Sequence, residues 1–177
     1  MTTEDFSRFM EQALSEADLA EKNGDVPVGA VIVQSGQIIA RGHNQREFAN
    51  DTTAHAEIVA IRKACQKLQR WILDDCELYV TLEPCLMCFG AIIQARIANV
   101  YFGAYDPKTG ACGSVAETAE LKNSALNHHT NFVGGLLEEE CAKKLKNFFQ
   151  KKRCFAKLNK VNKLESKDYG QTEKYKK

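Results

Sequence analysis

The sequence lacks the features that place a protein in a membrane or carry it out of the cell. No apolar run approaches the roughly 20 residues that a membrane-spanning helix needs. The N-terminus, Met-Thr-Thr-Glu-Asp-Phe, has neither the basic start nor the apolar stretch of a signal peptide. We therefore expect a cytoplasmic protein with no membrane partner.

A disulfide framework is not expected either, although the chain has seven cysteines. Their number is odd, and without an export signal the expected compartment is reducing. Cys85 and Cys88 form a Cys-x-x-Cys pair, which under these conditions indicates metal or redox chemistry. The remaining cysteines are expected to be free thiols: Cys65, Cys76, Cys112, Cys141 and Cys154.

The chain has little net charge, but its charges are unevenly distributed. Nine Lys and one Arg between residues 151 and 177 face three acidic residues, which gives this segment a charge of +7. Because the whole chain carries +1, residues 1–150 carry −6. An acidic body with a basic end can indicate a nucleic-acid partner. A solvated, poorly ordered terminus explains the same charges, and charge alone favours that simpler interpretation.

Length and composition are those of one soluble globular domain: 177 residues, 44% of them apolar and 27% charged. We expect a domain over residues 1–158 and a Lys-rich tail, partly disordered, over residues 159–177.

Helical and strand patterns alternate along the domain. An apolar stripe from Phe6 to Ala17 predicts a helix that ends at Asn23-Gly24. The β-rich runs Val28–Val33 and Gln37–Arg41 predict a hairpin about Ser35-Gly36. The further predicted elements are a helix from Thr53 or Ala54 to Lys67, a strand Leu78–Leu82, a helix with Pro84 in its first turn that ends near Ala95, strands at Val100–Gly103 and Phe132–Gly134, and a helix from Leu136 to Lys152. This alternation predicts an α/β fold in which helices cover a mixed sheet.

Cys85 and Cys88 lie three residues apart at the start of a predicted helix, so their side chains share one face within a single turn. The positive end of the helix dipole lowers the pKa of thiols there and favours metal binding. A catalytic zinc site takes three protein ligands and leaves the fourth position to water, so one further ligand is needed. His55 is the candidate, because it starts the preceding helix and one strand links that helix to the cysteines.

Glu57 follows His55 by two residues, which is about 200° around a helix axis. Both side chains can address one centre only if that centre lies off the N-terminal end of the helix. Zinc lowers the pKa of its bound water and so supplies hydroxide near neutral pH. An unligated carboxylate beside it can take the proton of this water and pass it on to the reacting groups.

Each part of this set has another interpretation. Cys-x-x-Cys also occurs as a redox pair or as half of a structural zinc site, and His-x-Glu alone carries little information. A structural site has four Cys or His ligands, and the sequence contains no second Cys-x-x-Cys or paired-His motif. The complete set, with Pro84 directly before Cys85, favours a catalytic zinc ion, one per chain.

His55-Ala56-Glu57 and Pro84-Cys85-Leu86-Met87-Cys88 resemble the signature of the cytidine deaminase-like superfamily. Within it, the chain from about Phe6 to Lys152 resembles the bacterial tRNA-specific adenosine deaminases. Asp106-Pro107-Lys108-Thr109-Gly110 is the most discriminating match. Further matches are Val26–Val31, His43-Asn44, Thr53–Glu57, Val80–Cys85, Phe102–Ala104, Gly113-Ser114 and Asn127-His128.

The resemblance implies a three-layer α/β/α fold with a mixed sheet of about five strands. It also implies a homodimer that deaminates the wobble adenosine of a tRNA anticodon to inosine, with zinc as cofactor and Glu57 as proton shuttle. Asn44 would hold the target base. The other residues implied in substrate binding are Val28, Ala56, Glu83, Asp106, Lys108, Asn127, His128, Lys151, Lys152 and Arg153. The chain departs from the family at Thr52, where the usual Asp-Pro-Thr-Ala-His motif has a proline that stiffens the approach to the helix.

Two other functions remain open from the sequence. A related family of guanine deaminases shares the zinc signature, but the loop 106–110 and the basic end of this chain argue against a free base as substrate. A catalytically silent zinc subunit that only binds tRNA could dispense with the carboxylate, so Glu57 argues against that function.

Overall fold

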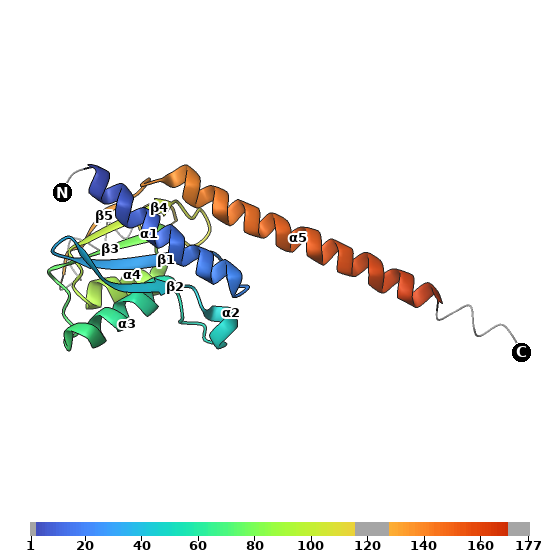
Figure 1. Cartoon of the computed structure of the whole chain (residues 1–177), viewed down its shortest axis with the longest axis horizontal. Coiled ribbons are helices and arrows are strands. Elements are labelled where there is room, and N and C mark those ends of the chain that lie inside the picture. The colour runs from blue at the N-terminus through green and yellow to red at the C-terminus, as the bar shows by residue number, and fades with distance from the viewer. Residues whose placement is uncertain (1–2, 116–127, 170–177) are drawn as a thin grey trace, which may run out of the picture. The chain divides into compact units, whose positions relative to one another are not determined.

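The structure, a computed structural model, describes residues 3–115 and 128–169. Five strands form one mixed sheet with the spatial order β2-β1-β3-β4-β5 (Figure 1). Their bounds are β1 Gly29–Gln34, β2 Gln37–His43, β3 Cys76–Leu82, β4 Asn99–Ala104 and β5 Asn131–Val133. β1 is antiparallel to both of its neighbours, β2 and β3, whereas β3, β4 and β5 are parallel. The predicted α/β class is confirmed.

The hairpin forms where the sequence predicts it. Ser35 and Gly36 connect β1 to β2 with φ angles of 49° and 75°. Positive φ at both central residues is the backbone of a turn that matches the twist of a two-strand hairpin.

Helices cover both faces of the sheet, and the molecule has three layers. α1 (Thr3–Lys22) lies on one face, where Phe9 packs with Val31, Val33 and Tyr79 (Figure 1). Cys141, in the first turns of α5 (Glu138–Tyr169), joins Met10, Ala13 and Ala104 on the same side. The opposite face is covered by α3 (Ala56–Leu68) and α4 (Leu86–Gln94). Its buried cluster includes Ala60 and Ala64 of α3, Ile92 of α4, and Ala30, Ile32, Leu78, Val80, Val100 and Phe102 of the strands.

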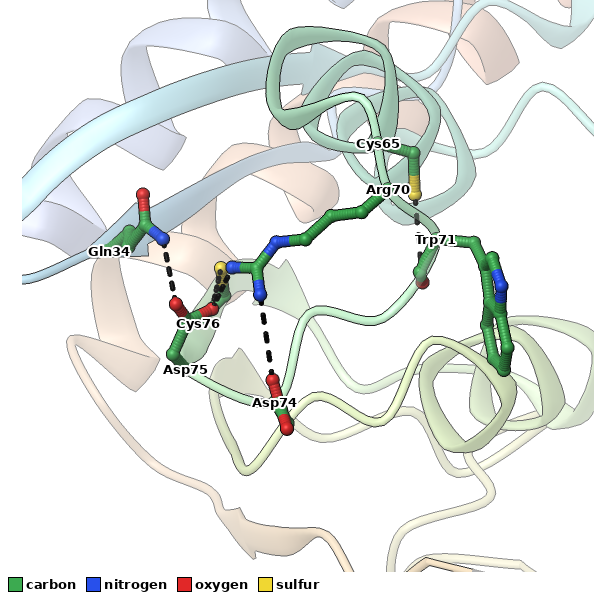
Figure 2. A network of polar contacts seen from close by, with 7 residues as sticks. All are labelled: Gln34, Cys65, Arg70, Trp71, Asp74, Asp75 and Cys76. Carbon is green, nitrogen blue, oxygen red and sulfur yellow. Dashed lines mark hydrogen bonds and ion pairs between the residues drawn. The ribbon is translucent and has the colours of Figure 1, made fainter.

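A polar network holds the connection between α3 and β3, the two elements that link His55 to Cys85. The guanidinium of Arg70 pairs with the carboxylates of Asp74 and Asp75 (Figure 2). Gln34 of β1 donates its side-chain amide to Asp75 over 2.8 Å, and Cys65 of α3 donates its thiol to the carbonyl of Trp71. Each exposed ion pair contributes little stability by itself. Together with the two hydrogen bonds, the pairs attach the loop to α3 through Cys65 and to β1 through Gln34.

Some element bounds differ from those predicted. α3 begins at Ala56 and α4 at Leu86, because His55 and Cys85 have extended backbones and are the N-cap residues. Pro84 therefore lies before α4 and not in its first turn. α5 continues to Tyr169 instead of ending near Lys152. The sequence contains no Gly or Pro between Lys152 and Gly170, so no residue that breaks helices ends it earlier.

The structure also contains a short helix that the sequence did not predict, α2 (Arg46–Ala49). Four residues are too few to show a helical period. The chain divides into two compact units, Met1–Leu145 and Lys146–Lys177. Within the described ranges, no helix is both long enough and apolar enough to span a membrane.

Two glycines allow helices to approach the β1–β2 hairpin closely. A Cβ at Gly29 would overlap the backbone of α1, and a Cβ at Gly42 would overlap the Ala56 carbonyl and lie 2.6 Å from the Ala60 nitrogen. Gly42 therefore sets how closely the start of α3 sits on β2.

We predict that Gly42→Ala destabilises the fold by about 1–3 kcal/mol, because the added methyl group pushes the start of α3 off the strand. Equilibrium urea unfolding measures this change. Gly90→Ala is the matched control: a Cβ at Gly90, inside α4, meets nothing within 4 Å. Alanine there should be neutral or stabilising. Equal stability of the two variants would contradict the close approach of α3 to β2.

Candidate metal centre

The first turns of α3 and α4 meet at one edge of the sheet. β2 and β3 both run antiparallel to β1, so they point in the same direction and their carboxyl ends lie at the same edge. α3 follows β2 and α4 follows β3. Their N-cap residues, His55 and Cys85, make no side-chain capping bond, which leaves both side chains to face a common point.

His55, Cys85 and Cys88 form a three-residue cluster at this point. Their ligand atoms all lie within 4.8 Å of one another. The Nδ1 atom of His55 is 3.6 Å from the Cys85 sulfur and 3.5 Å from the Cys88 sulfur. A tetrahedral zinc ion with bonds of about 2.3 Å to sulfur and 2.0 Å to nitrogen places such atoms about 3.5 Å apart. The cluster thus has the donor types and the spacing of a metal site.

The two thiols and the imidazole share protons. Hydrogen bonds, first from Cys88 and then from His55, lower the pKa of Cys85 to about 4. The pKa of Cys88 is raised, because its proton is held by the Cys85 sulfur and the side chain is buried. The pKa of His55 is also raised, chiefly by its hydrogen bond to Cys85. A cation bound here would take the place of these protons.

Glu57 is buried beside the cluster, as the second residue of α3. Its side chain is 4% exposed, and burial raises the pKa of its carboxyl group, while His55 partly opposes the shift. The cluster lies beyond the N-terminal end of α3. His55 and Glu57 can therefore both point toward it, although they are only two residues apart. A raised pKa makes this carboxyl group a stronger proton acceptor than an ordinary exposed carboxylate.

Asn44 and Val28 form a hydrogen-bonded pair that is linked to the segment before His55. The backbone N–H of Asn44 donates to the carbonyl of Val28 over 2.9 Å, and both residues are buried. Ala56 is fully buried at the start of α3. The N–H of Gln45 donates to the carbonyl of Ala54, and this bond joins the strand end that carries Asn44 to the segment that carries His55.

Asp25 holds Asn44 and the start of α2 in place, a role that the sequence analysis did not predict. Its carboxylate is fully buried and accepts the N–H groups of Glu47 and Phe48 over 2.9 and 3.0 Å. The side chain of Asn44 donates to it over 3.4 Å. Asp25 thereby caps α2 and orients Asn44, but its partners are about 20 residues away, so no local pattern reveals the role.

An Asx turn replaces the proline that is missing before His55. The carboxylate of Asp51 accepts the backbone N–H of Thr53 over 2.8 Å and its hydroxyl over 2.7 Å. These bonds lower the pKa of Asp51. A side-chain turn of this kind fixes the backbone by hydrogen bonding where a proline would fix it covalently.

The loop 106–110 lies next to the cysteine ligands, since Gly110 forms an isolated β-bridge with Cys85. Asp106 turns its carboxylate into the loop, where it accepts the N–H of Lys108 over 2.9 Å and the hydroxyl of Thr109. Lys108 is exposed. Glu83, 2% exposed, faces the same loop from the end of β3.

Of the remaining residues predicted to bind RNA, His128 lies near the other end of β4. His128 lies against the carbonyl of Ile97, before the start of β4, whereas the loop 106–110 follows the end of that strand. Lys151, Lys152 and Arg153 are exposed residues of the second unit. Asn127 falls outside the described residues. Their roles stay predictions.

Comparison with known proteins defines the class. A model of the MafB19-like deaminases matches residues 4–153. A solved structure from a study of A-to-I editing by tRNA:A34 deaminases superposes with a TM-score of 0.73 and 46% identity, covering 78% of this chain and 99% of that one. These matches, together with the fold and the cluster, identify the protein as a deaminase.

The curated relatives narrow the class. The tRNA-specific adenosine deaminase of Bacillus subtilis (strain 168) is 47% identical over 145 residues, which is 82% of this chain and 89% of that protein. The enzyme of the same description from Haemophilus influenzae is 46% identical, over 87% and 88% of the two chains. This chain belongs to the family of tRNA-specific adenosine deaminases. A guanine deaminase of Bacillus subtilis is also similar, with 37% identity over 82% of this chain and 92% of that one, and a lower TM-score of 0.55.

We predict that removing bound metal with a chelator adds Cys85 to the thiols that iodoacetamide modifies rapidly at neutral pH. Its low pKa, about 4, makes it a thiolate in the metal-free protein. Exposed Cys154 should react before and after chelation. Cys76 and Cys141 should stay unmodified, since burial raises the pKa of each to about 12. Peptide mapping by mass spectrometry reads all of these sites, and a Cys85 that is insensitive to the chelator would argue against the metal centre.

Proposed function

We propose that the protein is a zinc-dependent hydrolytic deaminase that converts the wobble adenosine of a tRNA anticodon to inosine and releases ammonia. The observation that carries the proposal is the cluster of His55, Cys85 and Cys88 with the buried carboxyl group of Glu57 beside it. Three protein ligands leave a fourth position open, as catalytic zinc sites do. The identity to tRNA-specific adenosine deaminases, 42–47% among several curated relatives, supports the substrate.

His55, Cys85 and Cys88 would hold the zinc ion. Bound there, zinc supplies a Lewis acid that lowers the pKa of water toward neutrality. Glu57 takes the proton from the attacking water and delivers it to the ring nitrogen next to the reacting carbon. Glu57 would then carry the proton of the newly added hydroxyl group to the amino group, which leaves as ammonia, so that one water molecule is consumed for each inosine formed. The raised pKa of Glu57 suits a group that must accept and return this proton.

A base in an anticodon loop suits this buried centre, because it can be turned out of a single-stranded loop at low cost. Asn44, Val28 and Ala56 would line the pocket for the base. Glu83 and the loop with Asp106 and Lys108 would lie beside the flanking nucleotides. The remaining proposed RNA contacts are Asn127, His128, Lys151, Lys152 and Arg153.

We also propose a homodimer. Two large apolar side chains in the first turn of α4, Leu86 and Met87, are 64% and 37% exposed beside the cysteine ligands, and a second copy would cover them. Residues 1–158 would form the deaminase domain and 159–177 a basic tail. The cytoplasm is the proposed compartment, because tRNA is the proposed substrate.

Guanine deamination is the second candidate, and the 37% identity to a guanine deaminase favours it. The higher identity to the tRNA enzymes and the basic segment after residue 150 favour RNA. A silent tRNA-binding subunit would not need the carboxyl group of Glu57.

The central experiment incubates the protein with an unmodified tRNA that carries a wobble adenosine and sequences the product for inosine, with guanine assayed in parallel. We expect editing of the tRNA and no ammonia from guanine.

Glu57→Gln should keep one zinc per chain but lose at least about 10²–10⁴-fold in rate, the usual contribution of general acid–base catalysis. A variant that retains a tenth of the activity would exclude Glu57 as the shuttle, and a fourth protein ligand to zinc would exclude a catalytic site.

We further predict that Lys151→Ala/Lys152→Ala/Arg153→Ala raises KM for tRNA and leaves the single-turnover rate at saturation nearly unchanged. Each lost phosphate contact should reduce the slope of binding against salt concentration by about one. Truncation after Asn159 is the control and should have a smaller effect, because we expect residues 160–177 to make fewer specific contacts with RNA. Normal binding and editing by the triple variant at physiological salt would make this segment a solvated surface only.

A further inference from the structure

A single buried side chain connects the loop after β4 to the segment that carries Cys85. One carboxylate oxygen of Glu83 accepts the backbone N–H groups of Cys112 and Ser114, over 2.9 and 3.0 Å. The other accepts the N–H of Asp106 over 2.9 Å and the hydroxyl of Ser114. Four hydrogen bonds therefore run from residues 106–114 to one carboxylate.

Backbone contacts reinforce this attachment. The N–H of Ala111 donates to the carbonyl of Pro84 over 2.9 Å, and the N–H of Glu83 donates to the carbonyl of Ala104. A Cβ at Gly110 would overlap the carboxylate of Glu83 and lie 2.6 Å from the carbonyl of Asp106. The glycine thus allows the loop to close over the carboxylate, and a larger residue would not.

The partners of Glu83 show what the carboxylate does. A buried carboxylate is costly unless its lone pairs are filled, and here N–H groups and one hydroxyl of the loop fill them. Both oxygens are already used within the protein. Glu83 thus has little capacity to bind a substrate directly, although the sequence resemblance implied such a contact.

We propose that Glu83 is a positioning residue, which fixes the loop 106–110 at a set distance from the metal ligand Cys85 and thereby sets the register of bound RNA. This inference rests on the proposed function, since it assigns the loop a contact with the nucleotides that flank the target base. Asp106 and Lys108 keep their places only while the loop is attached to Glu83. The side chain acts through the loop and touches neither the base nor the reacting atoms.

The test is Glu83→Gln, which keeps the shape of the side chain but turns an NH₂ group toward N–H donors. We expect the amides of Asp106, Cys112 and Ser114 to exchange with deuterium about tenfold faster or more. In single-turnover assays on an anticodon stem-loop, we expect the half-saturating RNA concentration to rise about tenfold, and the rate at saturation to stay within about threefold. Zinc content should remain one per chain.

Glu77→Gln is the matched control, because it makes the same change within β3, the strand that ends just before Glu83, at a carboxylate that accepts the hydroxyl of Tyr79 over 3.1 Å. It should alter neither exchange in the loop nor the assay. Ser114→Ala serves if Glu83→Gln does not fold: it removes only the hydroxyl bond and should shift exchange and half-saturation in the same direction by about threefold.

Three results would overturn the proposal: unchanged exchange in the loop, unchanged half-saturation, or a lower rate at saturation with half-saturation unaltered. The last would indicate that Glu83 acts on the reacting groups. If the unaltered protein edits no stem-loop, the proposed function fails. The exchange measurements then still decide whether Glu83 holds the loop.

Discussion

β2 and β3 flank β1 and run in the same direction, and the helices that follow them therefore begin at the same edge of the sheet. His55 and Cys85 are the N-caps of these helices, and Cys88 lies one turn into the second. The partial positive charge of two helix N-termini favours thiolates and a carboxylate in a buried place. The close approach at Gly42 and the polar network about Arg70 act on the same elements and so keep the three ligand atoms together.

Buried carboxylates organise the surroundings of this centre by accepting backbone N–H groups. Asp25 does this for α2 and Asn44, and Glu83 does it for the loop after β4. A short polar loop has few apolar contacts to fix it, so a charge-assisted bond to the fixed end of a strand is an effective alternative. Both segments are thereby attached to residues near the ends of strands without being part of the sheet.

The sequence predicts those features that depend on residues close together in the chain. Cys85 and Cys88, the hairpin turn at Ser35-Gly36 and the order of strands and helices all follow from local spacing and turn chemistry. The third ligand, His55, required the added argument that a catalytic site has three ligands. The hydrogen-bond partners of Asp25 and Glu83 could not be predicted, because they lie about 20 to 30 residues away in the sequence. The end of α5 was missed because an amphipathic stripe marks where a helix packs, not where it stops.

The protonation of the cluster makes its affinity for a metal ion dependent on pH. In the metal-free protein, protons occupy the place of a cation: Cys88 and His55 hold them, and burial raises the pKa of Glu57. Because thiolates and neutral imidazole are the ligand forms, a divalent cation must displace protons, and its binding strengthens as pH rises. The same positive charge lowers the pKa of the nearby Glu57, against the effect of burial. Burial of the carboxyl group and the charge of a bound cation therefore act in opposite directions on the pKa of Glu57, and metal binding favours the ionised form that accepts a proton.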